Sequence, residues 1–421
     1  MKAIRGGVCA PRGFRAGGIW CGIKAASRKR DLALIYSEKP CAAAAMFTTN
    51  RVQAACIQVS RKHLAGGVIR AVIANSGNAN ACTGEAGLAA ARRMADLAAD
   101  EFALRPGDVA VASTGVIGVP LPIAAIESGI SALADSLRAD EAGHDAALEA
   151  IMTTDTRKKD GALELELPGA APEGGMVPVR MGAMVKGSGM IHPGMATMLC
   201  FITTDAAISG KLLDSALRRA VNRSFNRLSV DGDTSTNDTI IVMANGMAGN
   251  RVIDAEGAAC DAFRGALERL CTGLVRAMAR DGEGATRLLS VTVSGAADED
   301  TAAVLAKSVV SSNLVKAACF GADANWGRVL CALGYAGAAF DPEAVDVRFR
   351  SAAGEVLVCK AGAAAPFSEE EAKRILSGEE IEILVDLGGP PSRKAGCGGT
   401  ATAWGCDLTY DYVKINGDYR S

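Results

Sequence analysis

The residues best suited to chemistry lie in one stretch, Lys186 to Asp205, which reads KGSGMIHPGMATMLCFITTD. A glycine-rich loop leads to Ala196-Thr197, and an apolar run from Met198 to Ile202 follows. A hydroxyl that attacks the carbonyl of the preceding residue needs a small neighbour and a tight backbone approach. This spacing fits self-cleavage before a threonine nucleophile. The same pattern is common where an ordinary loop enters a buried strand, because threonine favours strands, so the pattern alone leaves both interpretations open.

The sequence offers few residues for other common catalytic arrangements. It has only three histidines, His63, His144 and His192, and only His192 lies in a loop with other reactive side chains. Ser188 lies in Lys-Gly-Ser-Gly-Met, so the nucleophile motif G-x-S-x-G is absent, and neither a P-loop nor a G-x-G-x-x-G after a strand occurs. A threonine at a new chain N-terminus needs no histidine, because its own α-amine titrates near ~8 and can serve as the base.

No metal site is expected from the spacing of the candidate ligands. The histidines are too few and too dispersed for metal-dependent hydrolysis. The polar run that begins at Asp231 is similar to a calcium loop, but its twelfth position is Val242, where an EF-hand requires glutamate. The 13 cysteines contain no C-x-x-C pair, which favours a role as small buried hydrophobes in a reducing cytoplasm.

The overall composition is typical of an enzyme with a small polar substrate. The 421 residues are 49% hydrophobic and 22% charged, with 48 glycines that suit tight turns and close backbone approaches. A formal net charge of −2 gives no electrostatic reason to expect nucleic acid or an anionic membrane as a partner. The first residues contain no apolar signal-peptide segment, and no run approaches the ~20 apolar residues of a membrane span. We therefore expect a cytoplasmic protein.

The elements that must position these residues begin with a sheet. Apolar runs separated by turns predict initially antiparallel strands at residues 32–36, 43–47, 55–59 and 68–74. An Asn-rich segment, Asn75 to Asn80, precedes a predicted helix that ends near Leu104, and this segment is either simple turn chemistry or functional. A strand from Asp108 to Ala112 then leads to Ser113-Thr114-Gly115. A hydroxyl followed by glycine at a strand end suits the donors of an oxyanion hole, although this pattern is more often only a turn.

The rest of the chain predicts further strands and helices. Helical spacing or helix-favouring composition is found at 122–137, 211–227 and 258–280, and strand-like runs at 177–184 and 240–243. From residue 288, shorter strands alternate with helices at 301–319 and 368–376, and the second helix opens with a capping box, Ser368-x-x-Glu371. The last strands are predicted at 400–408 and 412–415. We predict a catalytic α/β domain of residues 1–286 and a smaller α+β domain of residues 287–421.

A series of ordered motifs gives the sequence a family resemblance. Over essentially its whole length it resembles the ornithine acetyltransferases, the glutamate N-acetyltransferases of arginine biosynthesis. The motifs that carry the resemblance are FTTNR (47–51), NSGNAN (75–80), STGVIG (113–118), MTTDT (152–156), KGSGMI (186–191), MATML (195–199), SVDGDT (229–234), DGEGAT (281–286), NWGR (325–328) and NGDYRS (416–421).

The resemblance implies an α/β (α+β) fold, a layered α-β-β-α sandwich of the self-cleaving ornithine acetyltransferase and aminopeptidase type with a smaller C-terminal α+β domain. It also implies a precursor that cuts itself between Ala196 and Thr197. The Thr197 hydroxyl would attack the Ala196 carbonyl, and water would hydrolyse the resulting ester. The products would be an α chain of residues 1–196 and a β chain of residues 197–421, and two copies of each are expected to form a heterotetramer.

The resemblance further implies ping-pong acetyl transfer. Thr197 would take the acetyl group from N2-acetylornithine, release ornithine and pass the acetyl group to glutamate. Thr114 and Gly115 match the oxyanion donors of the family. The substrate-binding positions are matched by Lys186, Thr197, Glu283, Asn416, Ser421 and one member of the Thr153-Thr154 pair, for which we select Thr154. In our interpretation Lys186 meets the substrate carboxylate and Glu283 meets the ornithine ammonium.

Some points stay open at this stage. We expect no cofactor, and acetyl-CoA is a candidate second acetyl donor, but no motif separates members that use it. Where the family commonly has Ala-Pro-Asn, this chain has His192-Pro193-Gly194, and Gly194 would loosen the loop and affect the rate of cleavage. One alternative is a self-cleaving aminopeptidase or amidase of the same fold with water as the acceptor. The other is an uncleaved binding or scaffold protein.

Overall fold

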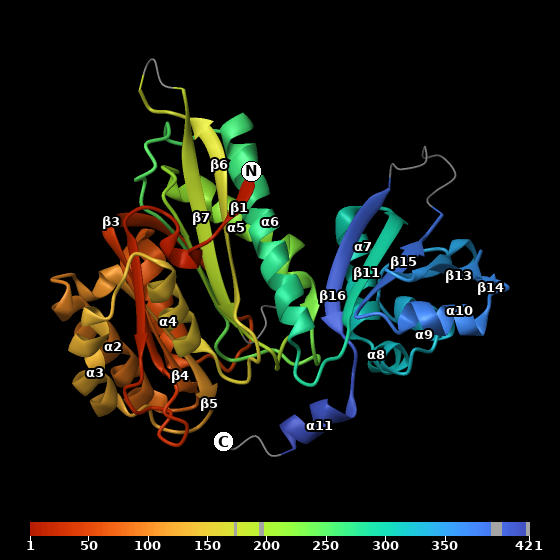
Figure 1. Cartoon of the computed structure of the whole chain (residues 1–421), viewed down its shortest axis with the longest axis horizontal. Coiled ribbons are helices and arrows are strands. Elements are labelled where there is room, and N and C mark those ends of the chain that lie inside the picture. The colour runs from red at the N-terminus through yellow and green to blue at the C-terminus, as the bar shows by residue number, and fades with distance from the viewer. Residues whose placement is uncertain (172–174, 193–197, 389–397, 418–421) are drawn as a thin grey trace. The chain divides into compact units, whose positions relative to one another are not determined.

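The chain forms two compact units. The computed structural model describes all residues except 172–174, 193–197, 389–397 and 418–421 (Figure 1). The first unit comprises Met1–Gly187, Gly194–Asn222 and Thr234–Leu274, and the second comprises Ser188–Pro193, Arg223–Asp233 and Val275–Ser421. The domain boundary at 286/287 stays a prediction.

A nine-stranded mixed sheet forms the centre of the first unit. Its strand order is β1-β6-β7-β8-β10-β3-β4-β5, and β2 pairs with β3. Most neighbours are antiparallel, whereas β8 and β10 run parallel, as do β4 and β5. The strands are β1 (Lys2–Ile4), β2 (Phe14–Ile19), β3 (Leu32–Phe47), β4 (Val68–Asn78), β5 (Val109–Val116), β6 (Lys159–Pro168), β7 (Met176–Lys186), β8 (Leu199–Thr204) and β10 (Thr239–Ala244).

Both faces of the β3–β5 part of this sheet are buried, so successive side chains along each strand point into two different cores. Leu32 and Leu34 face one core together with α1 (Ala55–His63), α2 (Gly84–Glu101) and α3 (Ile123–Asp135). Ala33 and Ile35 face a second core, which they share with Phe201 of β8, with β7 and β10, and with α4 (Glu141–Ile151). In Figure 1, α2 and α3 accordingly lie on the side of β4 and β5 that faces away from β7.

Helices also cover the outer face of the β6–β8 part of the sheet. The side chain of Leu270, in α6 (Ala258–Arg280), lies against Gly161 of β6, and Cys271 lies near Cys200 of β8. Arg219 of α5 (Gly210–Arg223) pairs with Glu268 of α6. The β3–β5 part and the β6–β8 part of the sheet form the two β layers on either side of the shared core, and each carries helices on its outer face. The first unit is therefore layered α-β-β-α, which confirms the predicted fold class.

The second unit is a smaller α+β assembly around a seven-stranded sheet. The strand order is β14-β13-β12-β15-β11-β16-β9, with β11 parallel to β15 and antiparallel to β16. The strands are β9 (Leu228–Ser229), β11 (Leu288–Ala296), β12 (Asp346–Ser351), β13 (Gly354–Lys360), β14 (Ala363–Ala364), β15 (Glu380–Asp386) and β16 (Gly399–Cys406). The helices are α7 (Glu299–Ser311), α8 (Asn313–Phe320), α9 (Trp326–Gly334), α10 (Glu369–Leu376) and α11 (Tyr410–Asn416).

Three element predictions are wrong. The run 55–59 is not a strand but the start of α1, where exposed Arg61 and Lys62 complete an amphipathic helix and favour its C-terminal end. The run 412–415 lies in α11 rather than in a strand. The single helix expected at 301–319 is two helices, because Ser312 breaks the first and caps the second by accepting a hydrogen bond from the N–H of Val315.

Other element predictions are confirmed. Helix α6 begins at Ala258 and ends at Arg280, as predicted. The hydroxyl of Ser368 accepts a hydrogen bond from the N–H of Glu371 (3.2 Å) and caps α10. The runs 32–36 and 43–47 are both strand, but they belong to one long strand, β3, which contains a register shift between Tyr36 and Cys41.

Among the residues that the structure describes, no single helix is long and apolar enough to span a bilayer. The consecutive helices α7 and α8 meet the length and composition requirement only as a pair, and that pair is bent by 57°. Their apolar side chains, among them Leu305, Val309 and Val315, are buried in the core of the second unit.

Truncation of Phe201 is expected to weaken the shared inner core. Phe201 is 2% exposed, so Phe201→Ala should leave a cavity and lower the free energy of unfolding by about 3–5 kcal/mol. Urea unfolding of the uncleaved Thr197→Ala background measures this change. Tyr335→Ala is the control, because Tyr335 is 62% exposed and its loss should cost less than about 0.5 kcal/mol. Equal effects of the two changes would contradict the assigned core.

Candidate active site

The residue that follows Thr197 is held firmly at the start of β8. The N–H of Met198 donates to Asp238 Oδ1 (3.0 Å), and its carbonyl accepts from the N–H of Thr239 (3.1 Å). The strand register pairs Leu199 with Lys186 of β7 on one side and with Thr239 of β10 on the other. Ala196 and Thr197 themselves lie outside the described residues, as does Gly194.

Two of the predicted site residues lie together in the first unit. Lys186 ends β7 and Thr114 lies in β5, and the Lys186 ammonium donates to Thr114 Oγ1 at 3.4 Å. Both residues are almost fully buried, at 2% and 3% exposure. A buried ammonium beside a hydroxyl creates a positive environment that would stabilise an oxyanion.

The carboxylate of Asp155 holds this ammonium in place. Asp155 Oδ2 lies 4.0 Å from the Lys186 ammonium, and Oδ1 lies 2.7 Å from that of Lys159. The same carboxylate accepts from the N–H groups of Thr153 (3.0 Å) and Gly187 (2.7 Å). Burial alone would raise the pKa of Asp155, but Lys186, Lys159 and these hydrogen bonds outweigh it and lower the pKa to about 2.

Gly115 can only be glycine in this structure. Its φ is +136°, and a Cβ added there would lie 2.3 Å from the carbonyl carbon of Gly77. The neighbouring Asn side chains are used for backbone support: Asn75 donates to the Asn78 carbonyl, and Asn78 donates to the carbonyls that follow β5. Most of the segment predicted as a turn is strand, because Asn75 to Asn78 belong to β4; only Asn80, with a φ of +47°, shows the expected turn chemistry.

Asp238 is a buried acid that sequence reasoning missed; it directly precedes β10 and accepts the hydrogen bond from Met198. It is fully buried, and burial raises its pKa well above the usual carboxyl range, although the bond from Met198 and the charge of Lys186 oppose this shift. Its Oδ2 atom has no hydrogen-bond partner among the residues that the structure describes. The sequence signal was a polar run that we compared only with a calcium loop.

The second unit brings together another pair of predicted residues. Glu283 is buried, and its Oε2 accepts from the Asn416 side-chain amide (2.9 Å). The N–H of Glu283 donates to the Ser188 carbonyl (2.8 Å). A Cβ added at Gly189 would lie 2.2 Å from the Glu283 carboxylate, so the glycine lets the loop pass over this acid.

Asp231 orders the loop that contains Gly189. Its carboxylate accepts from the N–H groups of Met190 (2.5 Å) and Ile191 (2.9 Å). The ring of His192 lies within hydrogen-bond distance of the Ser229 hydroxyl (3.1 Å), and partial burial lowers the pKa of His192. Asp231 was missed as an ordering residue because its motif was assessed only as a calcium loop and as part of the family resemblance.

Thr154 and Ser421 are the remaining predicted site residues. Thr154 is half-buried and lies directly before Asp155, and which member of the Thr153-Thr154 pair binds substrate stays open. Ser421 lies outside the described residues. Among the residues that are described, no group of His, Cys, Asp and Glu could hold a metal ion.

One protein family matches almost the whole chain. The ArgJ family model matches residues 15–421. The arginine biosynthesis bifunctional protein ArgJ of Symbiobacterium thermophilum is 52% identical over 422 residues, which cover 100% of both chains. The protein of the same name from Caldanaerobacter subterraneus subsp. tengcongensis is 49% identical over 421 residues and is also covered completely.

A solved structure is similar to part of the chain. The crystal structure of arginine biosynthesis bifunctional protein argJ from Bacillus halodurans is 45% identical and covers 52% of this chain and 97% of that chain, with a TM-score of 0.48. The full-length matches of the family model and of the two relatives confirm the resemblance that the motifs indicated. This chain belongs to the ArgJ family, the family of the ornithine acetyltransferases.

Proposed function

We propose that this chain is an acetyltransferase of arginine biosynthesis that moves the acetyl group of N2-acetylornithine to glutamate through an ester on Thr197. The observation that carries the proposal is the full-length family match, which includes the Met-Ala-Thr motif. The buried Lys186–Thr114 pair in the first unit and the Glu283–Asn416 pair in the second support it.

Self-cleavage makes the nucleophile. The Thr197 hydroxyl attacks the Ala196 carbonyl, the peptide C–N bond breaks, and the chain is joined by an ester. Water then hydrolyses the ester and leaves Thr197 with a free α-amine. The fixed backbone of Met198 supports this step, because an anchored residue after the nucleophile limits how far the attacking hydroxyl can move.

Acetyl transfer then takes two similar half-reactions. The Thr197 oxygen attacks the acetyl carbonyl, its proton passes through the α-amine to the departing ornithine nitrogen, and the C–N bond breaks. The glutamate amine attacks the resulting ester, and the C–O bond to Thr197 breaks. Each step passes through a tetrahedral oxyanion, to which the Thr114 hydroxyl and the Gly115 N–H donate, with the Lys186 ammonium adding positive charge.

The proposal assigns substrate contacts to the family-matched positions. Lys186 meets the substrate carboxylate and Glu283 meets the distal ammonium of ornithine, with Asn416 orienting the Glu283 carboxylate. Thr154 and Ser421 complete the assigned set. Acetyl-CoA is proposed as a second acetyl donor. The processed chains are proposed to assemble as two α and two β chains and to work in the cytoplasm.

The central residue can be tested by the number of chains. Thr197→Ala should remain one chain of 43.1 kDa on a denaturing gel and show no acetyl transfer, because no hydroxyl is left to attack Ala196. Thr197→Ser is the matched control and should still yield two chains, since it keeps a hydroxyl. Cleavage of the alanine variant would remove Thr197 from the proposal.

The oxyanion role of Thr114 predicts a loss in kcat. Thr114→Val keeps the shape of the side chain but removes the hydroxyl, and kcat for acetylornithine-to-glutamate transfer should fall by about 100-fold or more. Thr114→Ser should recover most of this loss. A valine variant with kcat near that of the parent protein would show that the hydroxyl gives no transition-state stabilisation.

Asp238→Asn is expected to stabilise the protein more at neutral than at acidic pH. At low pH the carboxyl is protonated in both states; above its ordinary pKa of ~3.9 the unfolded state ionises while the raised pKa of Asp238 keeps the folded state protonated. Stability therefore falls by up to about 1.4 kcal/mol per pH unit, and asparagine avoids this loss. Unfolding of both proteins in the Thr197→Ala background at pH 4 and pH 7 measures the difference. A stability difference that does not change with pH would contradict the buried, protonated state.

A further inference from the structure

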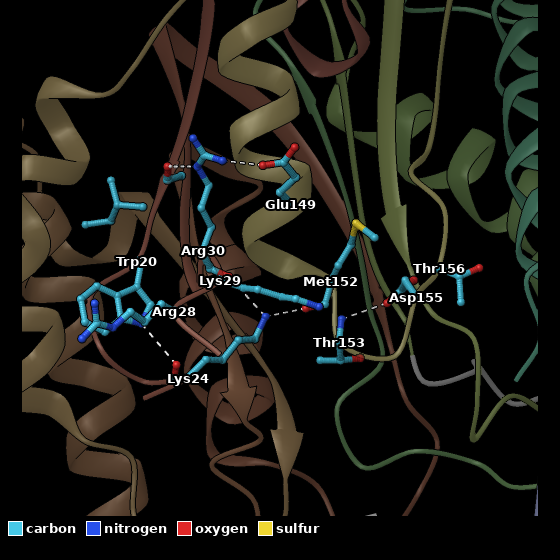
Figure 2. A pocket seen from close by; sticks show the side chains of 12 residues that line it. Trp20, Lys24, Arg28, Lys29, Arg30, Glu149, Met152, Thr153, Asp155 and Thr156 are labelled. Atoms are coloured by element: carbon cyan, nitrogen blue, oxygen red, sulfur yellow. Dashed lines mark hydrogen bonds and ion pairs between the residues drawn. The ribbon is translucent and has the colours of Figure 1, made fainter. Parts of the chain in front are cut away.

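The first unit contains a cavity of about 740 Å³, which is lined mainly by the loop between β2 and β3 and by the segment after α4. Figure 2 shows Trp20 and Arg28 on one side of it, Thr153 and Asp155 on the other, and Lys24 between them. Its volume is in the range of cavities that bind whole ligands. None of the assigned roles uses the Trp20–Arg28 side.

The outer side of the cavity carries positive charge beside an exposed aromatic ring. Arg28 and Lys29 have no carboxylate partner among the residues that the structure describes, whereas Arg30 pairs with Glu149. Trp20 is 44% exposed, and the Arg28 guanidinium lies 6.0 Å from its ring centroid. Unpaired cations next to a flat ring are the groups that bind a phosphorylated ligand with an aromatic base.

Hydrogen bonds to a buried carboxylate order the start of the loop that carries these groups. The buried carboxylate of Asp31 accepts from the N–H groups of Cys21 (2.7 Å), Gly22 (3.2 Å) and Lys24 (2.8 Å). Three backbone donors on one carboxylate fix the path of residues 21–24 beside Trp20, which reduces the entropy cost of binding there.

Lys24, on the inner side of the cavity, packs against the strands that carry the proposed oxyanion donors. The Lys24 ammonium donates to the Met152 carbonyl (2.6 Å), and its side chain packs on Gly77, where an added Cβ would lie 2.8 Å from Lys24 Cγ. Gly77 pairs with Gly115 in the register of β4 and β5. Burial, together with the charges of Lys186 and Lys29, lowers the pKa of Lys24 to about 8, although Asp31 and Asp155 oppose the shift. A bound anion would offset this crowding of positive charge.

We propose that this cavity is the subsite for a phosphate-bearing acyl donor, a coenzyme A thioester, with its phosphates on Arg28 and Lys29, its base on Trp20 and its acyl group directed toward Thr114 and Gly115. The inference rests on the proposed function, because it supplies the same ester. The Thr197 oxygen bonds to the thioester carbonyl carbon, the C–S bond breaks, and the sulfur leaves with the hydroxyl proton. Glutamate then takes the acetyl group as before.

An amino-acid substrate fits this side of the cavity less well. N2-acetylornithine carries a distal ammonium, which the cations Lys24, Arg28 and Lys29 would repel. A diphosphate presents several anionic oxygens, and these match the two unpaired cations.

The test uses adenosine 3′,5′-bisphosphate, which carries the phosphates and base of the donor without an acyl group. Titration calorimetry with the self-processed protein should detect binding, and an Arg28→Ala/Lys29→Ala variant should weaken it by about tenfold or more. The KM for acetyl-CoA in glutamate acetylation should rise similarly, while transfer from acetylornithine changes by less than about twofold. Quenching of Trp20 fluorescence, lost in Trp20→Phe, reports the contact with the base.

The matched control is Lys62→Ala/Arg92→Ala, which removes the same charge from exposed positions on α1 and α2 and should leave binding unchanged. Absence of binding at millimolar concentration overturns the proposal, as does equal weakening by the control or equal affinity for inorganic pyrophosphate. A protein that binds the bisphosphate but fails to transfer acetyl from acetylornithine would refute the proposed function and not the subsite.

Discussion

The buried carboxylate of Asp155 is the interaction on which the first-unit half of the candidate site depends. It holds two ammonium groups and two backbone N–H groups, and so ties the segment after α4 to the last residue of β7. Removal of one partner from such a buried ion pair typically costs about 3–5 kcal/mol, because the remaining charge has no solvent. The Lys186 ammonium beside Thr114 thus lies near a carboxylate that is already paired with Lys159, so the positive environment needed for an oxyanion belongs to a fixed arrangement of buried charges.

Strand ends bring the other groups into place. Thr114 and Gly115 lie near the end of β5, Lys186 ends β7, and Met198 precedes β8, so one sheet supplies both the proposed oxyanion donors and the anchor for the nucleophile. Glycines permit the close approaches, since Gly115 lies against the Gly77 backbone and Gly189 lies against the Glu283 carboxylate. In both places a methyl group would occupy space that another atom already fills.

The sequence predicted some of this and could not have predicted the rest. The sequence predicted α6 at about 258–280, the bounds that the structure has, because a long helical stretch carries a strong signal. The start of α1 was mistaken for a strand, because five residues, four of them apolar, carry too little periodicity to separate the two states. The Lys186–Thr114 contact joins residues 72 positions apart on β7 and β5, which are not neighbours in the sheet, so only the three-dimensional fold reveals it. Asp155 and Asp238 were missed for the same reason: their roles depend on burial and partners rather than on residue type.

The most direct test of the central claim is to trap the intermediate. The purified protein would be incubated with N2-acetylornithine without glutamate, quenched in acid and mapped by mass spectrometry. The account predicts one acetyl group, on the peptide that begins with Thr197, held as an ester that hydroxylamine or added glutamate removes. An acetyl group on a lysine, or a protein that releases ornithine without ever carrying acetyl on Thr197, would contradict it.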